Sequence, residues 1–284
     1  EYRGYDSCGI CLHTNDGFEI HKAVGDTSNL DNIKADSVIG IGHTRWATHG
    51  TVALKNAHPH ISSCGNIVLV HNGIIENSNI LKDKIGSNFV CKSDTDSEVL
   101  VNLISSHYMA DFVKAVENAL TEVRGTYGIA VVHKDHPDTV ICARRGSPLC
   151  IGYGNGETFV SSDPYALPPH IDKVTYLDDN QLAVIKNNKI VVKQSAKIID
   201  PEVNKLNITR TAIACDGYSC FLEKEIHEQP EALKNAMRGR FNKDGDNIKL
   251  SGIKLPRKVK RVIFLGCGTA YHAGIVGKYY MDNI

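Results

Sequence analysis

The sequence predicts an α+β fold of antiparallel sheets covered by helices, followed by the opening of a separate α/β unit. Short runs rich in Ile and Val recur between turn residues, which is typical of strands. Two stretches have the spacing of amphipathic helices, and a later apolar run leads through glycines into a helical pattern. With 284 residues, 42 % of them hydrophobic, the chain is long enough for a substantial core.

Turn chemistry indicates how the strands pair. Asn187 and Asn188 stand between two apolar runs, and they predict a tight hairpin because Asn tolerates positive φ. Such a hairpin joins antiparallel strands. The expected strands are Val38–Ile41, Ile67–Val70, Ile129–Val132, Thr139–Cys142, Leu182–Ile185 and Ile190–Val192.

Helical spacing is found at Asp96–Tyr108 and Asp111–Val123. In the second stretch Phe112 and Val116 lie on one apolar face, and Gly125 follows as a stop signal. We expect these two helices to cover a sheet.

The composition changes along the chain and predicts two domains joined by a linker. From about Ser195 to Arg257 the residues are polar and charged, with one helix expected in EKEIHEQPEALKNAMRGR. The segment VKRVIFLGCGTAYHAG then predicts a strand, a glycine loop and a helix, which open a parallel α/β unit. We therefore predict a first domain at 1–212, a linker at 213–252 and the beginning of a second domain at 253–284.

Charge and cysteine content indicate which classes of binding partner and which cellular compartment to expect. Lys and Arg total 32, as do Asp and Glu, so we expect neither nucleic acid nor a membrane surface as a partner. No apolar run reaches the ~18 residues that a membrane helix needs. Nine cysteines, an odd number, indicate free thiols and a cytoplasmic location. Because no initial Met is present, we expect a fragment cut at both ends.

The densest polar cluster is GHTRWATHG, which follows an expected strand. It contains Arg45, Trp46, Thr48 and His49 between glycines. A loop at a strand end is a common place for a site, and Arg45 is able to clamp a carboxylate through two hydrogen bonds. A packed loop with a surface arginine is the alternative.

Two further segments carry candidate site residues. In VHNGII, the Asn72 amide and the Gly73 N–H are suitable donors for an oxyanion, although Asn-Gly is also a turn signal. In SDTDSEV, three carboxylates precede a helix, and helix capping is the default explanation for Asp94, Asp96 and Glu98.

Neither the histidines nor a Cys-x-x-Cys pair predicts a metal site. Five histidines lie between His43 and His71, but Pro59 and the lack of paired cysteines nearby leave no tetrahedral ligand set. Cys8 and Cys11 form one isolated pair, for which a strand position is the better interpretation than zinc or redox chemistry.

The glycine loop near the end of the chain predicts an anion site. Backbone N–H groups at Cys267 and Gly268, the Thr269 hydroxyl and the following helix N-terminus are able to hold a phosphate. The spacing matches neither GxGxxG nor a Walker loop, so a nucleotide is not expected.

Taken together, these motifs resemble the glutamine:fructose-6-phosphate aminotransferase family over nearly the whole chain. They occur in the family's order, and the pairing of an amidotransferase segment with a sugar-isomerase segment separates this family from other class II amidotransferases. The matching segments are EYRGYDS (1–7), HTRWATHG (43–50), NAHPH (56–60), VHNGIIEN (70–77), DTDSEV (94–99), RRGSPL (144–149), EKEIHEQP (223–230) and GCGTAYHAG (266–274).

The resemblance implies an N-terminal-nucleophile glutaminase fold with αββα layers, followed by the start of a sugar-isomerase (SIS) domain. It implies glutamine hydrolysis coupled to the conversion of fructose 6-phosphate to glucosamine 6-phosphate, with no cofactor and no metal. It also implies a homodimer formed through the SIS domains.

By the same resemblance, Arg45 binds the glutamine α-carboxylate, Asp96 binds its α-amino group, and Asn72 and Gly73 form the oxyanion hole. The remaining implied positions fall into three groups: Trp46, Thr48 and His49 in a closing loop, Arg3 as support for the nucleophile, and Cys267, Gly268 and Thr269 in the sugar-phosphate site.

The nucleophile of the family is an amino-terminal Cys whose own α-amine is the base. It is expected before Glu1, outside this chain; Cys8 in Cys8-Gly9-Ile10 imitates it but has no free amine. Two alternatives stay open. The chain alone is a catalytically silent fragment that binds glutamine and a sugar phosphate, or it belongs to another class II amidotransferase, such as the amidophosphoribosyl type.

Overall fold

The computed structural model describes residues 6–46, 51–87, 89–195, 197–206, 217–238, 259–266 and 269–282. The chain divides into two compact units, Glu1–Ala214 and Cys215–Ile284. No helix in the described ranges is both long and apolar enough to cross a membrane.

The first unit is built on a seven-stranded antiparallel sheet with the order β13-β12-β11-β7-β6-β5-β4. Its strands are β4 (His60–Ile61), β5 (Ile67–Ile75), β6 (Gly125–His133), β7 (Thr139–Arg145), β11 (Gln181–Lys186), β12 (Lys189–Gln194) and β13 (Lys197–Ile199). Asn187 and Asn188, with φ of 48° and 60°, form the tight turn between β11 and β12, which confirms the predicted hairpin.

Two smaller antiparallel sheets complete the β structure. The order β2-β1-β3 comprises β2 (Gly17–Val24), β1 (Ser7–Thr14) and β3 (Ile39–Arg45). The order β14-β10-β8-β9 comprises β14 (Asn204–Lys205), β10 (Lys173–Tyr176), β8 (Cys150–Tyr153) and β9 (Thr158–Ser161). Cys8 and Cys11 lie buried in β1, as the strand interpretation predicted.

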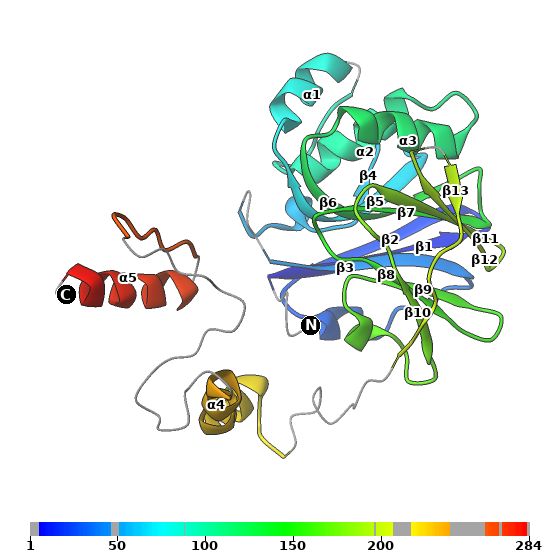
Figure 1. The fold of residues 1–284 in the computed structure, drawn as a ribbon. Helices are drawn as coiled ribbons and strands as arrows, with labels where there is room; N and C mark the ends of the chain where they lie inside the picture. Colours follow the sequence, from blue (N-terminus) through cyan, green and yellow to red (C-terminus); the bar gives the residue numbers. More distant parts are fainter. Residues whose placement is uncertain are drawn as a thin grey trace. The chain divides into compact units, whose positions relative to one another are not determined.

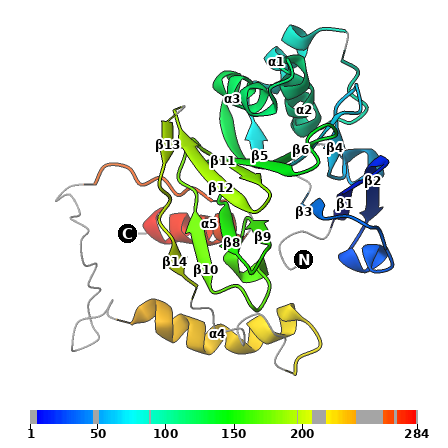
Figure 2. The same ribbon diagram turned by 90° about the vertical axis from the view of Figure 1, so that its right-hand side faces the viewer.

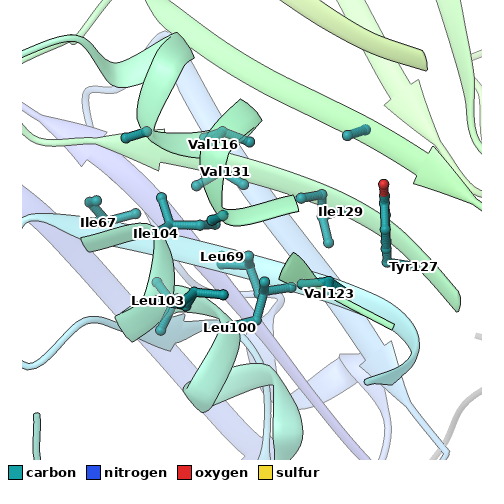
Figure 3. Close-up of a cluster of buried hydrophobic side chains, with 14 of the residues drawn as sticks. Ile67, Leu69, Leu100, Leu103, Ile104, Val116, Val123, Tyr127, Ile129 and Val131 are labelled. Carbon is teal, nitrogen blue, oxygen red and sulfur yellow. The ribbon is translucent and has the colours of Figure 1, made fainter. Parts of the chain in front are cut away.

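Helices α1 (Ser78–Ile85), α2 (Asp96–Ser106) and α3 (Phe112–Glu122) cover one face of the large sheet (Figure 1). Leu100 and Leu103 of α2 and Val116 of α3 are buried against alternate residues of β5 and β6, such as Leu69 and Ile129 (Figure 3). Because side chains alternate along a strand, the intervening residues face the opposite side.

The other face of the large sheet packs on the two smaller sheets (Figure 2). Val68 and Val70 of β5 contact Cys11 and Ile41 of the three-stranded sheet, while Ile151 of β8 joins a cluster with β7, β11 and β12. Over the outer face of β8, a short 3₁₀ segment (Pro164–Ala166) leads into Leu167, which packs there. In the described residues α1 to α3 cover the outer face of the large sheet, and a second β layer covers its inner face, which agrees with the predicted α+β glutaminase class.

The second unit contains α4 (Phe221–Met237) and α5 (Thr269–Asp282). Phe264 lies against Gly274 and Gly277 of α5, where an added Cβ would come within 3.2 and 3.1 Å of its side chain. The strand expected before the glycine loop is not formed in residues 259–266. A strand requires a neighbour for its hydrogen-bond ladder, and none pairs with these residues in the described part of the unit.

The core around α2 makes a stability prediction. Leu100 is 0 % exposed, so Leu100→Ala should leave a cavity and lower the free energy of unfolding by about 2–5 kcal/mol. Ile80→Ala on α1, where the side chain is 67 % exposed, should change it by less than about 0.5 kcal/mol. Urea denaturation of both variants measures the difference; equal losses would contradict the assigned core.

Candidate functional site

Asn72 and Gly73 lie inside β5 and not in a turn. They continue the antiparallel ladder with β6, in which Gly73 pairs with Tyr127. Gly73 has φ of 144°, and a Cβ there would lie 2.2 Å from the carbonyl oxygen of Thr126. Glycine is therefore required by the close approach of β6 and by the backbone angle, and the turn alternative is wrong.

Arg45 is the last residue of β3, and it is only 5 % exposed. Its Nη1 donates to the carbonyl oxygen of Thr51 over 3.4 Å. Burial lowers the pKa of the guanidinium, while the carboxylates of Asp6 and Asp96 oppose that effect. The buried guanidinium thus lies in the field of acidic groups from two other segments.

Asp96 opens α2 and is bonded to the end of β5. Its Oδ2 accepts a hydrogen bond of 2.7 Å from the Ile75 amide. Asp96 and Glu98 lie in the first turn of α2, where the helix dipole favours their charge, as expected. Asp94 precedes the N-cap, and its carboxylate accepts from Lys55 and Asn56 of another segment instead of capping the helix.

Glu98 also makes hydrogen bonds outside α2. Its carboxylate accepts from the amides of Lys92 and Ser93, which precede the helix. The N-cap residue Thr95 makes no side-chain capping bond. Glu98 is therefore held by backbone amides of the segment just before the helix, whereas the partners of Asp94 come from a distant segment.

Strand alternation turns two of the predicted residues toward the same side of the large sheet, where Arg45 is buried and Asn72 is exposed at the end of β5. Asn72 has the parity of Val70, and Arg45 has that of Ile41, and both of these apolar residues face the inter-sheet core. Asp96 reaches the same end of β5 from the helical side. A cation, an anion and a pair of hydrogen-bond donors from three distant segments therefore gather at one end of the sheets.

A cluster of histidines lies beside these residues, and the sequence analysis did not assign it to the site. The His43 ring stacks on His58 with centroids 4.3 Å apart, and His60 meets His58 edge-on at 4.6 Å. His58, His60 and His71 are each at most 4 % exposed. The run of five histidines between His43 and His71 was the available signal.

The cluster is held uncharged. Burial is the main cause that lowers the pKa of His43 to about 4 and of His60 to about 3, and the positive charge of Arg45 adds to both effects. Burial also lowers the pKa of His58 and His71. Among the residues that the structure describes, no three His, Cys, Asp or Glu side chains are grouped to hold a metal ion.

The remaining predicted site residues stay predictions. Trp46 directly follows β3 and is 58 % exposed. Thr269 begins α5 in the second unit. Arg3, Thr48, His49, Cys267 and Gly268 lie outside the described residues.

Comparison with known proteins defines the class. Residues 26–220 match the model of the glutamine amidotransferase domain, so the chain belongs to this family. It is 43 % identical to a glutamine–fructose-6-phosphate aminotransferase (isomerizing) of Bacteroides thetaiotaomicron and 42 % identical to one of Caldanaerobacter subterraneus subsp. tengcongensis. Each alignment covers 100 % of this chain and 48 % of the relative, so the chain spans about half the length of these curated relatives.

Solved structures agree on the fold. A glutamine phosphoribosylpyrophosphate amidotransferase from B. subtilis superimposes with a TM-score of 0.57 at 24 % identity, over 69 % of this chain and 45 % of that one. A structure described as the allosteric regulatory enzyme of purine biosynthesis gives 0.56 at 22 %, over 68 % and 43 % of the two chains. The shared feature is the amidotransferase fold of the first unit.

The neutral cluster predicts a pH dependence of stability. In the unfolded chain each histidine titrates near 6.5, whereas His43 and His60 do so at about 4 and 3 in the folded protein. The unfolded state therefore binds more protons below pH 6.5. Each such histidine should lower the free energy of unfolding by up to about 1.4 kcal/mol per pH unit as the pH falls toward its folded pKa.

Urea midpoints measured between pH 7.5 and 5.0 check this expectation. A variant His60→Asn should show a shallower decline, since one titrating group is removed. His170→Gln, at a site where the side chain is 54 % exposed, is the matched control and should keep the original slope. A midpoint that does not fall with pH would show that the cluster is charged or exposed.

Proposed function

We propose that the protein to which this chain belongs is a glutamine-dependent aminotransferase that converts fructose 6-phosphate to glucosamine 6-phosphate. This chain would hold most of its glutaminase half. The observation that carries the proposal is the gathering of Arg45, Asp96 and the Asn72-Gly73 donors at one end of the β layers. The aminotransferase relatives that match the whole chain support the choice of acceptor.

Free glutamine carries an α-carboxylate and an α-ammonium group, and the site offers a complement to each. The guanidinium of Arg45 pairs with the carboxylate through two parallel N–H bonds. Asp96, whose Oδ2 accepts from the Ile75 amide and fixes the carboxylate in place, receives the ammonium group through its negative charge. The opposite charges of these two residues fix the direction in which glutamine enters.

The carboxamide of glutamine is then opened by a thiolate. Attack forms a C–S bond and an oxyanion, which the Asn72 side-chain amide and the Gly73 N–H stabilise. Collapse expels ammonia, which takes up the proton that the nucleophile gave to its base, and water hydrolyses the resulting thioester to glutamate. Ammonia is transferred internally and reacts at the ketone of fructose 6-phosphate.

The nucleophile in this proposal is an amino-terminal Cys of the complete protein, with its α-amine as base. The thiols in the sheets are poor substitutes. Cys8 sits within β1 and donates its thiol hydrogen to the Asp26 carbonyl. Burial raises the pKa of Cys11, Cys142 and Cys150 to about 12, which leaves almost no thiolate near neutral pH.

The second unit supports the acceptor half of the proposal. Thr269 stands at the N-terminus of α5, where a hydroxyl and a helix dipole favour a phosphate. Cys267 and Gly268, which lie outside the described residues, are proposed for the same phosphate site from the sequence. Dimerisation through the sugar-isomerase domains and a cytoplasmic location belong to the same proposal. Seven free cysteines among the described residues suit a reducing compartment.

A second candidate is that the polypeptide from Glu1 to Ile284 by itself binds glutamine without turning it over. Both statements hold together for a complete enzyme and its isolated segment. Ammonia release by the isolated chain above background would disprove the silent state. Another class II amidotransferase is less favoured, since the glycine loop before α5 does not match a nucleotide-binding pattern.

Removal of an oxyanion donor tests the first half-reaction. Asn72→Ala in the complete protein should lower glutaminase kcat about 10²- to 10³-fold, because the developing negative charge loses a donor. The assay is glutamate formation at saturating glutamine. Near-normal turnover would remove Asn72 from the oxyanion hole.

Substitution of the proposed carboxylate ligand separates binding from chemistry. Arg45→Lys keeps the charge but loses the two-bond fork, so the KM for glutamine should rise about tenfold or more with a smaller change in kcat. Lys193→Arg, on β12 in a pair with Glu117, is a control of the same kind outside the site. An unchanged KM for glutamine in Arg45→Lys would contradict the assigned role.

A further inference from the structure

Buried side chains adjoin the proposed glutamine site along the chain. His71 directly precedes the oxyanion donor Asn72, and Ser97 directly follows Asp96. Both are 3 % exposed, and His71 Nδ1 lies 2.9 Å from Ser97 Oγ. This contact joins the strand that carries the oxyanion donors to the helix that carries the ammonium ligand.

The hydrogen-bond partners of His71 fix its tautomer. Its Nε2 lies 3.3 Å from the carbonyl oxygen of Thr126, which only accepts, so Nε2 carries the hydrogen. The neutral ring then has a lone pair at Nδ1, and the Ser97 hydroxyl donates to it. With its hydrogen used in this way, Ser97 is free to accept one further bond.

His58 supplies that bond and closes the connection. The His71 amide donates to His58 Nδ1 over 3.3 Å, which leaves the hydrogen of the His58 ring on Nε2. His58 Nε2 lies 3.5 Å from Ser97 Oγ and donates to it. The ring nitrogens of His58 and His71 and the Ser97 hydroxyl thus all have hydrogen-bond partners that fit neutral histidines.

The position of His58 follows from the strand register. His60 pairs with Leu69, and the same register continued by two residues sets His58 opposite His71. Pro59 between them has no N–H and cannot continue the ladder. The side chain of His58 therefore receives the amide hydrogen that a strand backbone would otherwise accept.

We propose that His58, Ser97 and His71 form a neutral positioning relay that holds the first turn of α2 against the end of β5, and so sets the spacing between Asp96 and the Asn72-Gly73 donors. The proposal rests on the proposed glutaminase function. None of the three touches glutamine in it. Their role is to hold residues that do.

The relay makes the geometry of the site sensitive to acid. A proton on His58 Nδ1 removes the acceptor of the His71 amide, and a proton on His71 Nδ1 displaces the Ser97 hydroxyl hydrogen toward Asp96 Oδ1, 3.4 Å away. The charged and titratable groups that face the relay are His43, His60, Lys22 and Asp96, and Arg45 acts on His43 and His60 beside it. All but Asp96 oppose an added positive charge.

Paired substitutions in the complete protein test the relay. His58→Asn keeps an acceptor near the position of Nδ1, whereas His58→Leu removes it at similar size. We expect glutaminase kcat/KM to fall by about tenfold to a hundredfold in His58→Leu and by less than about threefold in His58→Asn. The acid limb of kcat/KM should also move in His58→Asn, because the titrating ring is gone.

Ser97→Ala has a matched control in Ser62→Ala. Both serines are 3 % exposed, and Ser62 Oγ accepts from the Ile67 amide at the opposite end of β5. Loss of stability should be similar in the two variants, but only Ser97→Ala should lower kcat/KM, by about tenfold. Unchanged kcat/KM in both Ser97→Ala and His58→Leu, with glutaminase active in the parent, would overturn the relay and leave the proposed function intact.

Imidazole nitrogen shifts provide a readout that does not depend on catalysis. In ¹⁵N-histidine-labelled protein at pH 6, His58 and His71 should both be neutral with the hydrogen on Nε2, assigned by the loss of signals in His58→Asn and His71→Gln. A charged ring or the Nδ1–H tautomer at either position would overturn the relay. Absence of glutaminase activity in the parent enzyme would instead overturn the proposed function, and with it the role assigned to the relay.

Discussion

The hydrogen bond from the Ile75 amide to Asp96 Oδ2 joins the two halves of the site. It connects the end of β5 to the first residue of α2, two elements separated in the chain by α1. Asp96 stands at a helix N-terminus, where the dipole favours its negative charge. Buried apolar contacts between α2 and β5 bring the elements together. The Ile75–Asp96 bond and the His71–Ser97 contact then set how their ends meet.

Burial of polar groups around this contact carries an energetic constraint. Three nearly inaccessible histidines and a buried guanidinium lie within the same end of the β layers. Such groups are tolerated when they are uncharged and hydrogen-bonded, or when opposite charges face them. The histidines follow the first rule, and Arg45, facing Asp6 and Asp96, follows the second. Buried polar side chains thus line this end of the β layers beside the proposed glutamine ligands.

Backbone geometry, as well as side chains, determines where the proposed oxyanion donors lie. Gly73 is held so close to Thr126 that no other residue fits without displacing β6. Pro59 interrupts the edge of the sheet, and the His58 side chain takes over the unpaired amide. Both features lie beside the proposed oxyanion donors. On the β4 side of β5 the backbone ladder stops at Pro59, so the His71 amide there bonds to a side chain instead of to a neighbouring strand.

The sequence by itself determined the central strands β5, β6, β7, β11 and β12, helices α2 and α3, the hairpin at Asn187-Asn188, the buried strand position of Cys8 and Cys11 and, through its motifs, the family. These depend on local periodicity and turn chemistry, which a few neighbouring residues specify. Only the tertiary structure decided that Asn72 and Gly73 lie within a strand, that Asp96 bonds to β5 and that four histidines meet. Register and long-range packing control those contacts, and no local window of sequence contains them.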